Sequence, residues 1–472
     1  MPQHPKALYI CSLGEVFNRF AYYGLQATLV LYVVHVFFFN NLQAYSAYGV
    51  LTTLAFCLPV LGGFITDRVF GARHSIFLGI VLTIIGALAL CGTGSRALYM
   101  GLTLLIIGIG FFKPANAALL GVAYQHNPSQ RESGFTLFYL AMNLGAILGP
   151  VVFGVLALRY GWRSAFIGNA AATFICLLVY VINKPSLTSP EFTKNKTHMT
   201  IAYGIIIGII ILVFLLFQFH WLFEVSFWTM CLCLITWMVL LAKQLPAITR
   251  NRLFLLLLLD LFAVFYFACQ MQVGSSLMIF IDQYVHLKLF GYTIPAAVFA
   301  ALEPVFVILT APLLSPCWNL LSKQNIIIPP VARLAGGLLL GSASFWVLSY
   351  SSMIASISWL ISGIVIGNAL LGAGELCIGP TLTSAVTYLV PQKLTSTFMG
   401  VWFLSVALSG YLGSVLARLT ETSQGIGSFQ GAFQKISLIG FVAALILLAI
   451  SPYLKYLRSE QIVYAETPAP YD

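Results

Sequence analysis

Long apolar stretches, separated by short polar, glycine-containing or proline-containing segments, follow one another along the chain. A helix needs about 20 apolar residues to cross the hydrocarbon core of a bilayer, and the sequence supplies fourteen stretches of that kind. They begin near Ala7, Tyr45, His74, Tyr99, Gly134, Ser164, Thr200, Trp221, Leu253, Ile294, Asn325, Ile354, Thr395 and Ala432. The pattern therefore predicts an all-α polytopic membrane protein with about 14 transmembrane helices.

Composition supports this interpretation and removes several classes of protein. Of the 472 residues, 60% are hydrophobic and only 8% are charged, whereas a soluble domain carries roughly 25% charged residues. The nine cysteines include no CxxC pair, so neither a disulfide scaffold nor a zinc site is predicted. The net charge of +10 comes from scattered residues, which argues against a nucleic-acid partner.

The basic residues also predict how the chain lies in the bilayer. If the N-terminus is cytoplasmic, fourteen Lys and Arg residues fall in cytoplasmic segments, six fall outside and three lie within spans. Cytoplasmic loops of membrane proteins are enriched in Lys and Arg. We therefore expect an even number of spans and two cytoplasmic termini.

The most polar internal stretch runs from Lys184 to His198 and divides the chain. It predicts two six-helix bundles with an additional helix pair between them. The expected units are an N-terminal bundle (1–183), a cytoplasmic linker (184–199), two additional helices (200–243), a C-terminal bundle (250–458) and a cytoplasmic tail (459–472). A weak internal echo relates the bundles, because GIG precedes Lys113 and GAG precedes Glu375, as expected of a transporter built from repeats.

Six charged residues fall where lipid is expected. A charge at this depth costs several kcal/mol unless it faces protein or water, so each one is a functional candidate. They are Glu15, Arg19, Lys113, Asp260, Glu303 and Glu375. The spacing of Glu15, Asn18, Arg19 and Tyr22 places these side chains on one helix face, which predicts a polar central cavity. The alternative for Glu15 and Arg19 is a buried structural ion pair.

The second span ends in the string GFITDRVFGAR (residues 63–73). It matches the GxxxDRxxGxR loop motif of the major facilitator superfamily. The residues that carry the match are Gly63, Asp67, Arg68 and Arg73. We expect them to form a cytoplasmic gate, with glycine allowing close helix contact and the charged groups capping and pairing helix ends.

Five further segments resemble the signatures of the proton-dependent oligopeptide transporters of that superfamily. They are EVFNRFAYYG (15–24), GFFKPAN (110–116), FYLAMNLG (138–145), GEL (374–376) and GVWFL (400–404). The likeness runs from about residue 8 to 455 in the family's order, and prokaryotic members also place two helices between the bundles. The resemblance implies the major facilitator fold.

The resemblance also implies a way to hold a peptide. Arg19 and Lys113 would bind the carboxylate, with Tyr23 hydrogen-bonding beside them, and charge-assisted bonds would make this end strong. Glu375 would hold the amino group from the opposite bundle, and Asn143 would bond the peptide backbone. Proton coupling needs a carboxylate whose proton affinity changes as the site opens and closes, and Glu15 beside Arg19 is the leading candidate.

The sequence departs from the family pattern at several positions. Asn18 stands where the motif has a second acid, Met271 precedes QVGSSL where many relatives have an acid, and Phe56 replaces a tyrosine. Glu303 precedes Pro304 where the family has Asn, a residue that assists Glu375 in binding the amine. Glu303 therefore becomes a candidate for both substrate binding and proton coupling, since two neighbouring acids can share a proton. The alternative is an altered substrate preference.

These observations predict a monomeric carrier in a bacterial inner membrane that imports di- and tripeptides by proton symport through alternating access. The proton gradient would drive it without a cofactor or metal. An enzyme is not expected, since no two histidines lie closer than His198 and His220 and an HExxH zinc helix is impossible. A channel would not need opposed terminal clamps. Two alternatives remain: the same fold carrying another small amino-bearing or anionic solute, or a facilitator or exchanger with weakened proton coupling.

Overall fold

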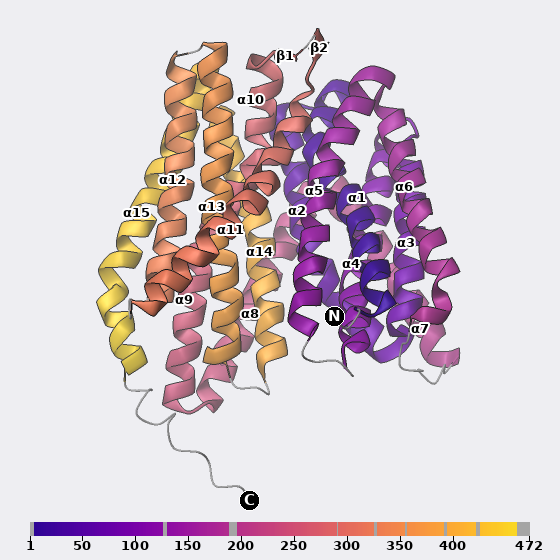
Figure 1. The fold of residues 1–472 in the computed structure, drawn as a ribbon. Coiled ribbons are helices and arrows are strands. Elements are labelled where there is room, and N and C mark those ends of the chain that lie inside the picture. Colours follow the sequence, from indigo (N-terminus) through magenta and orange to yellow (C-terminus); the bar gives the residue numbers. More distant parts are fainter. Residues whose placement is uncertain are drawn as a thin grey trace, which may run out of the picture.

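The computed structural model describes residues 4–125, 130–187, 196–289, 291–324, 328–354, 356–390, 394–421 and 425–459. The chain begins with α1 (Lys6–Phe37), α2 (Asn41–Ile65), α3 (Gly71–Ala89), α4 (Ser95–Ala123), α5 (Arg131–Tyr160) and α6 (Trp162–Ile182). These helices form the N-terminal bundle, drawn in indigo to magenta in Figure 1. A capping box starts α2, because the Asn40 side chain accepts from the Gln43 amide at 2.9 Å and the Gln43 side chain accepts from the Asn40 amide at 3.2 Å.

The C-terminal bundle follows two additional helices, α7 (Lys196–Gln218) and α8 (His220–Gln244). Its helical elements are α9 (Ala247–Gln270), the 3₁₀ turn η4 (Met271–Gly274), α10 (Ser276–Tyr284), the 3₁₀ turn η5 (Ala296–Ala301), α11 (Leu302–Lys323), α12 (Pro330–Ile354), α13 (Ile357–Leu389), α14 (Thr395–Ala417), η7 (Arg418–Glu421) and α15 (Ile426–Ser459). Two short antiparallel strands, β1 (Lys288–Leu289) and β2 (Tyr292–Thr293), lie between α10 and η5.

The described part of the chain contains thirteen helical stretches that are long and apolar enough to cross a membrane. One of them, Asn41–Ala89, has 49 residues and would measure about 74 Å if straight, more than twice the thickness of the hydrocarbon core. It contains a reversal, because a π-helical turn, η1 (Thr66–Phe70), is followed by Gly71 at φ 71°. The stretch therefore makes two crossings, α2 and α3. The predicted fourteen crossings and the all-α membrane fold are found.

Glycines bring the helices of each bundle into backbone contact. A Cβ on Gly79 of α3 would lie 2.6 Å from the carbonyl oxygen of Gly108 on α4. In the other bundle, a Cβ on Gly374 of α13 would lie 3.0 Å from the carbonyl oxygen of Gly337 on α12. Small residues allow such close approach between helices. The GIG string of α4 and the GAG string of α13 thus each provide a place of close helix packing.

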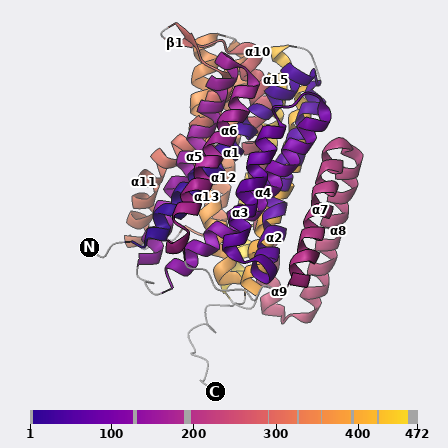
Figure 2. The same cartoon turned by 90° about the vertical axis from the view of Figure 1, so that its right-hand side faces the viewer.

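The α7–α8 pair stands at the side of the molecule (Figure 2). Each helix is attached to a different bundle. On α7, the Tyr203 hydroxyl lies 2.7 Å from His74 Nε2 of α3, and on α8 the Phe227 ring stacks on Tyr411 of α14 at 4.6 Å between centroids. Most of α8 is exposed, as expected for a helix that faces lipid.

The start of α1 and the end of α15 lie at the same end of the molecule (Figure 1), here called the terminal end. The bundles are tied together at the opposite end. There, His35 Nε2 of α1 lies 3.0 Å from Asp282 Oδ2 of α10, and the Asn41 side chain of α2 donates to Glu421 Oε1 at 2.8 Å. The structure is therefore a state in which the two bundles are closed against each other at the end away from the termini.

Two of the predicted units extend beyond the described residues. Residues 188–195 of the predicted linker 184–199 lie outside them, and helix α7 begins within that linker, at Lys196. The predicted start of a span at Asn325 also lies outside, and α12 begins at Pro330. The predicted tail 459–472 lies outside after Ser459.

Candidate functional site

Arg19 is the centre of the polar face on α1. Its Nε donates to Glu15 Oε1 at 3.1 Å, and its Nη1 donates to the Tyr23 hydroxyl at 3.1 Å. Its Nη2 points at the sulfur of Met142 on α5, 3.2 Å away. A thioether is a weak acceptor, so Nη2 is the part of the guanidinium with the weakest existing partner.

Glu15 is almost completely buried, at 1% exposed. Its second carboxylate oxygen accepts from Asn116 Nδ2 of α4 at 3.2 Å, and the Asn116 amide oxygen in turn accepts from the Tyr180 hydroxyl of α6 at 2.7 Å. The ion pair with Arg19, which the sequence offered as the alternative to a functional role, is therefore embedded in a network that spans three helices. Sequence reasoning assigned no role to Asn116, although this residue closes the GFFKPAN string.

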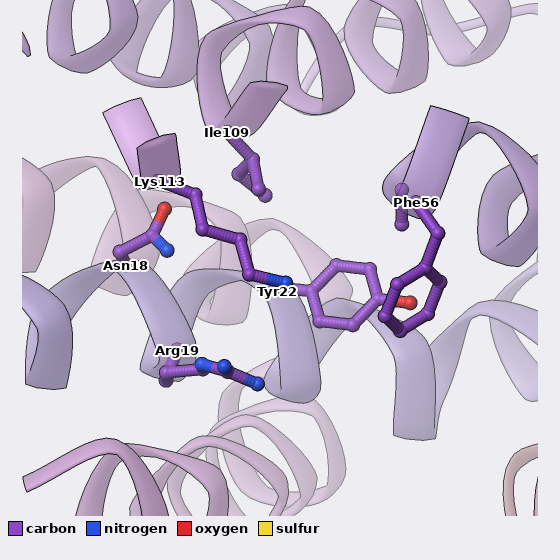
Figure 3. Close-up of a pocket in the computed structure, with 7 residues that line it drawn as sticks. Asn18, Arg19, Tyr22, Phe56, Ile109 and Lys113 are labelled. Atoms are coloured by element: carbon purple, nitrogen blue, oxygen red, sulfur yellow. The ribbon is translucent and has the colours of Figure 1, made fainter. Parts of the chain in front are cut away.

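A pocket opens beside this network, between α1, α2 and α4 (Figure 3). Its lining residues are Asn18, Arg19, Tyr22, Ala55, Phe56, Ile109 and Lys113. The Lys113 ammonium lies 5.0 Å from the centroid of the Phe56 ring, close enough for a cation–π interaction. The ring that replaces the family's tyrosine is thus the neighbour of this cation. Of the predicted polar face of α1, Asn18, Arg19 and Tyr22 line the pocket, and Glu15 does not.

Two carboxylates of the C-terminal bundle meet at one amide group. Gln270, at the end of α9, donates from Nε2 to Glu303 Oε1 at 2.9 Å and to Glu375 Oε2 at 2.8 Å. Glu303 Oε1 and Glu375 Oε2 therefore accept from the same nitrogen, so the two carboxylates are close neighbours. The expected proximity of Glu303 and Glu375 is found, but sequence reasoning missed Gln270.

Glycine also places these two acids together. Glu303 lies in the first turn of α11, directly after the 3₁₀ turn η5. A Cβ on Gly372 of α13 would lie 3.1 Å from the carbonyl oxygen of Glu303. Because α11 and α13 approach so closely at this point, the side chain of Glu375, one helical turn further along α13, comes within reach of the same amide.

The remaining predicted residues lie at different distances from this centre. Asn143, on α5 one residue after Met142, is half-buried and donates to the Tyr139 carbonyl oxygen at 3.0 Å. Met271 is 7% exposed and lies 3.7 Å from Gln26 Nε2 of α1. A neutral contact between the bundles therefore stands where relatives have an acid.

Asp260 lies away from the other acids. It precedes Gln270 by ten residues on α9, about 15 Å along a helix axis, and is 3% exposed. The Ser405 hydroxyl of α14 lies 3.4 Å from Oδ2, and Oδ1 is without a hydrogen-bond partner. The structure therefore does not bring Asp260 to the site.

The predicted gate residues differ in the contacts they make in the described part of the chain. Asp67 and Arg68 are exposed on the π-helical turn, and no ion pair found among the described residues involves either of them or Arg73. Arg68 instead lies over the Phe64 ring at 4.4 Å. Exposed charges gain little from pairing because water screens them. Gly63 does pack as expected, with its Cβ position 3.5 Å from Pro114 of α4.

Among the described residues, no group of three or more His, Cys, Asp or Glu side chains is placed to hold a metal ion. The site is instead a divided charge arrangement. Two cations, Arg19 and Lys113, belong to the N-terminal bundle, and two carboxylates, Glu303 and Glu375, belong to the C-terminal bundle. Such an arrangement fits a solute that carries both charges.

Comparison with known proteins supports this interpretation. The model of the POT family matches residues 73–438 of the chain. The chain belongs to the POT family. The dipeptide and tripeptide permease A of Pectobacterium carotovorum is 27% identical, over 99% of this chain and 94% of its own length. The dipeptide and tripeptide permease B of Photorhabdus luminescens is also 27% identical, over 97% and 98%.

Solved structures of POT transporters share the fold. A mutant of the peptide transporter POT in complex with alafosfalin superimposes with a TM-score of 0.85 at 28% identity, covering 96% of each chain. A POT family transporter in complex with 5-aminolevulinic acid gives a TM-score of 0.81 at 25% identity, covering 96% of this chain and 97% of its own. The predicted major facilitator fold and the predicted family are confirmed.

Proposed function

We propose that this chain is a secondary active transporter that imports di- and tripeptides by proton symport through alternating access. The observation that carries the proposal is the division of charge between the bundles. Arg19 and Lys113 lie on one side, and Glu303 and Glu375 on the other. A peptide is a zwitterion, so each bundle would hold one end of it and substrate binding would favour the closing of the bundles around it.

The carboxylate end of the peptide fits the cations of the N-terminal bundle. Arg19 Nη2 is aimed at the Met142 sulfur, a weak acceptor that a carboxylate oxygen would replace with a large gain in bond strength. The Lys113 ammonium lies over an aromatic ring, 5.0 Å away, and it carries three donors that such a ring uses poorly. Tyr23 would add its hydroxyl, and Asn143 would bond the peptide backbone.

The amino end fits the acids of the C-terminal bundle. Glu303 and Glu375 converge on one nitrogen at 2.9 Å and 2.8 Å, the distances of a charge-assisted hydrogen bond to an amine. Both side chains are half-buried, so the acids remain accessible while water is partly excluded. Peptide side chains would occupy the space between the bundles without a fixed polar partner.

Two acids are placed to carry the proton. Glu15 is compensated by Arg19, so a substrate that draws the guanidinium away would leave Glu15 buried and uncompensated, and proton uptake would follow. Glu303 faces Glu375, and like charges at such a distance favour sharing one proton. The first arrangement couples the proton to the carboxylate of the substrate and the second couples it to the amine. No cofactor is required, since the proton gradient supplies the energy.

The same proposal includes the membrane in which the carrier lies, its orientation there and its oligomeric state. The fourteen-to-six bias of basic residues favours a bacterial inner membrane with both termini cytoplasmic. The start of α1 and the end of α15 lie at one end of the molecule (Figure 1), which supports this orientation. In that orientation the structure is closed toward the outside. The carrier would act as a monomer, because each chain holds both halves of the site.

Two alternatives have specific support. A related POT transporter has been crystallised with 5-aminolevulinic acid, so another small amino-bearing or anionic solute is a second candidate cargo for this fold. Asn18 and Met271 stand where relatives have acids, which supports a facilitator or exchanger with weakened proton coupling. Retention of Glu375 favours a cargo with a free amine.

Uptake of labelled dialanine into proteoliposomes tests the proposal. The experiment compares an inward proton gradient, no gradient, and a gradient collapsed by a protonophore. We expect accumulation above equilibrium that the protonophore abolishes. Equilibration without accumulation would make the protein a facilitator or exchanger, and an absence of uptake that persists with reconstituted, folded protein would contradict a peptide cargo.

A further inference from the structure

Gln270 occupies an unusual position for a neutral side chain. It is the last residue of α9, where the helix gives way to the 3₁₀ turn η4. A single atom, its Nε2, donates to Glu303 of α11 and to Glu375 of α13. Three helices of the C-terminal bundle therefore meet at one nitrogen.

The chemistry around that nitrogen suits a cation better than an amide. An amide group has two N–H donors, and here each can serve one carboxylate. An alkylammonium group has three donors and a full positive charge, which two carboxylates would bind far more strongly. Among the described residues, no ion pair involves Glu303 or Glu375. Glu303 and Glu375 thus converge on a point that suits a positive charge, and the neutral amide nitrogen of Gln270 occupies that point.

We propose that Gln270 is an internal stand-in for the amine of the substrate. In the substrate-free chain its amide nitrogen occupies the subsite between Glu303 and Glu375, and the substrate must displace it to bind. The inference rests on the proposed peptide transport and adds a determinant of specificity to it. A protonated amine displaces the neutral amide because it brings a charge and a third donor. A solute with a blocked amine offers only another neutral donor and gains nothing by the exchange.

Two substitutions of similar length separate this role from a merely structural one. Gln270→Met has a similar length but no N–H donor. Its side chain is therefore not held between the two acids, and the amine subsite should be free for the substrate. Gln270→Lys puts a tethered ammonium between the two acids, so it should fill the subsite permanently. A structural role for Gln270 would make both variants bind worse, whereas displacement predicts effects of opposite sign.

The readout is the equilibrium binding of dialanine and of N-acetyl-dialanine to the purified full-length protein. Gln270→Met should bind dialanine about tenfold more tightly, because two hydrogen bonds to carboxylates no longer have to be broken, and should leave N-acetyl-dialanine unchanged. Gln270→Lys should bind dialanine at least about a hundredfold more weakly, and its preference for dialanine over the acetylated peptide should vanish. Its thermal midpoint should stay at or above that of the wild type.

Gln26→Met is the matched control. Gln26 also donates within the membrane, to the Tyr48 hydroxyl at 3.0 Å, but touches neither acid, so the ratio of the two affinities should not move. Weaker or unchanged dialanine binding by folded Gln270→Met would overturn the inference while leaving peptide transport intact. If the wild type itself does not bind dialanine, the proposed function fails, and the inference falls with it.

Discussion

The two halves of the site handle their charges differently. In the N-terminal half, Arg19 is already paired with Glu15, which is 1% exposed and also accepts from Asn116. In the C-terminal half, Glu303 and Glu375 share one neutral amide donor. In the first half one of the two cations is paired before substrate arrives, and Lys113 has only the Phe56 ring beside it among the described residues, while the second half carries negative charge that only a ligand or a proton can balance. From this difference we expect Glu303 and Glu375 to contribute most to both the binding energy of the substrate and the coupling to protons.

The backbone does not explain that difference, because both halves are built alike. Gly108 of α4 and Gly374 of α13 each approach a neighbouring backbone closely, and each precedes a charged residue of the site. The two halves thus share close helix packing at glycine but differ in how their charged side chains are paired. The predictions below test whether the divergence matters as much as the geometry indicates.

The largest effect is expected at Glu375. Glu375→Gln removes one of the two negative charges from the amine subsite and should weaken dialanine binding by about a hundredfold or more, abolishing uptake. Equilibrium binding to purified protein measures it. Glu224→Gln is the control, because Glu224 lies on the peripheral helix α8, paired with His220 at 3.1 Å. Retained affinity in Glu375→Gln would mean that the amine is bound elsewhere.

Glu303→Gln should separate binding from energy coupling. We expect it to abolish uptake driven by a proton gradient while leaving counterflow exchange of dialanine, because the amide can still accept from an amine but can no longer share a proton with Glu375. Paired proteoliposome assays of driven uptake and exchange measure both quantities. Unchanged driven uptake would remove Glu303 from proton coupling and leave Glu15 as the candidate.

Much of this arrangement could be predicted from the sequence. The spans were readable because a bilayer imposes long apolar helices, and the charges of α1 and α4 stood out because lipid tolerates so few. The ion pair of Glu15 with Arg19 followed from i, i+4 spacing within one helix. The proximity of Glu303 and Glu375 was expected only through a family resemblance, since they lie on different helices.

What the sequence could not predict depended on packing between helices. Nothing in the chain marks Gln270 as the donor to two acids, because the contact depends on how α9, α11 and α13 cross. The contact of Lys113 with Phe56 was hidden for the same reason. The sequence also did not indicate that Arg68 of the gate motif lies over the Phe64 ring.

Alanine substitutions of two adjacent glycines, Gly336 and Gly337, test the packing of α12 against α13 that positions Glu375. Gly337→Ala on α12 would place a Cβ 2.5 Å from Ile378 and 3.0 Å from the Gly374 carbonyl oxygen. Overpacking of this kind costs about 1–3 kcal/mol, so we expect a thermal midpoint several degrees lower and reduced dialanine affinity through displaced Glu375. Gly336→Ala meets nothing within 4 Å and should match the wild type. Equal midpoints for the two variants would show that α12 and α13 separate without cost.

The smallest effect is expected in the N-terminal half, at Phe56. Phe56→Leu removes the ring 5.0 Å from the Lys113 ammonium, and a partly buried cation–π contact contributes about 1 kcal/mol, so dialanine binding should weaken about fivefold. Phe56→Tyr keeps the ring and should bind dialanine within about twofold of the wild type, since the cation loses no partner. Binding titrations on both variants measure the difference. An effect of Phe56→Leu as large as that of Glu375→Gln would break the comparison, because it would place the decisive energy in the half where Arg19 is already paired.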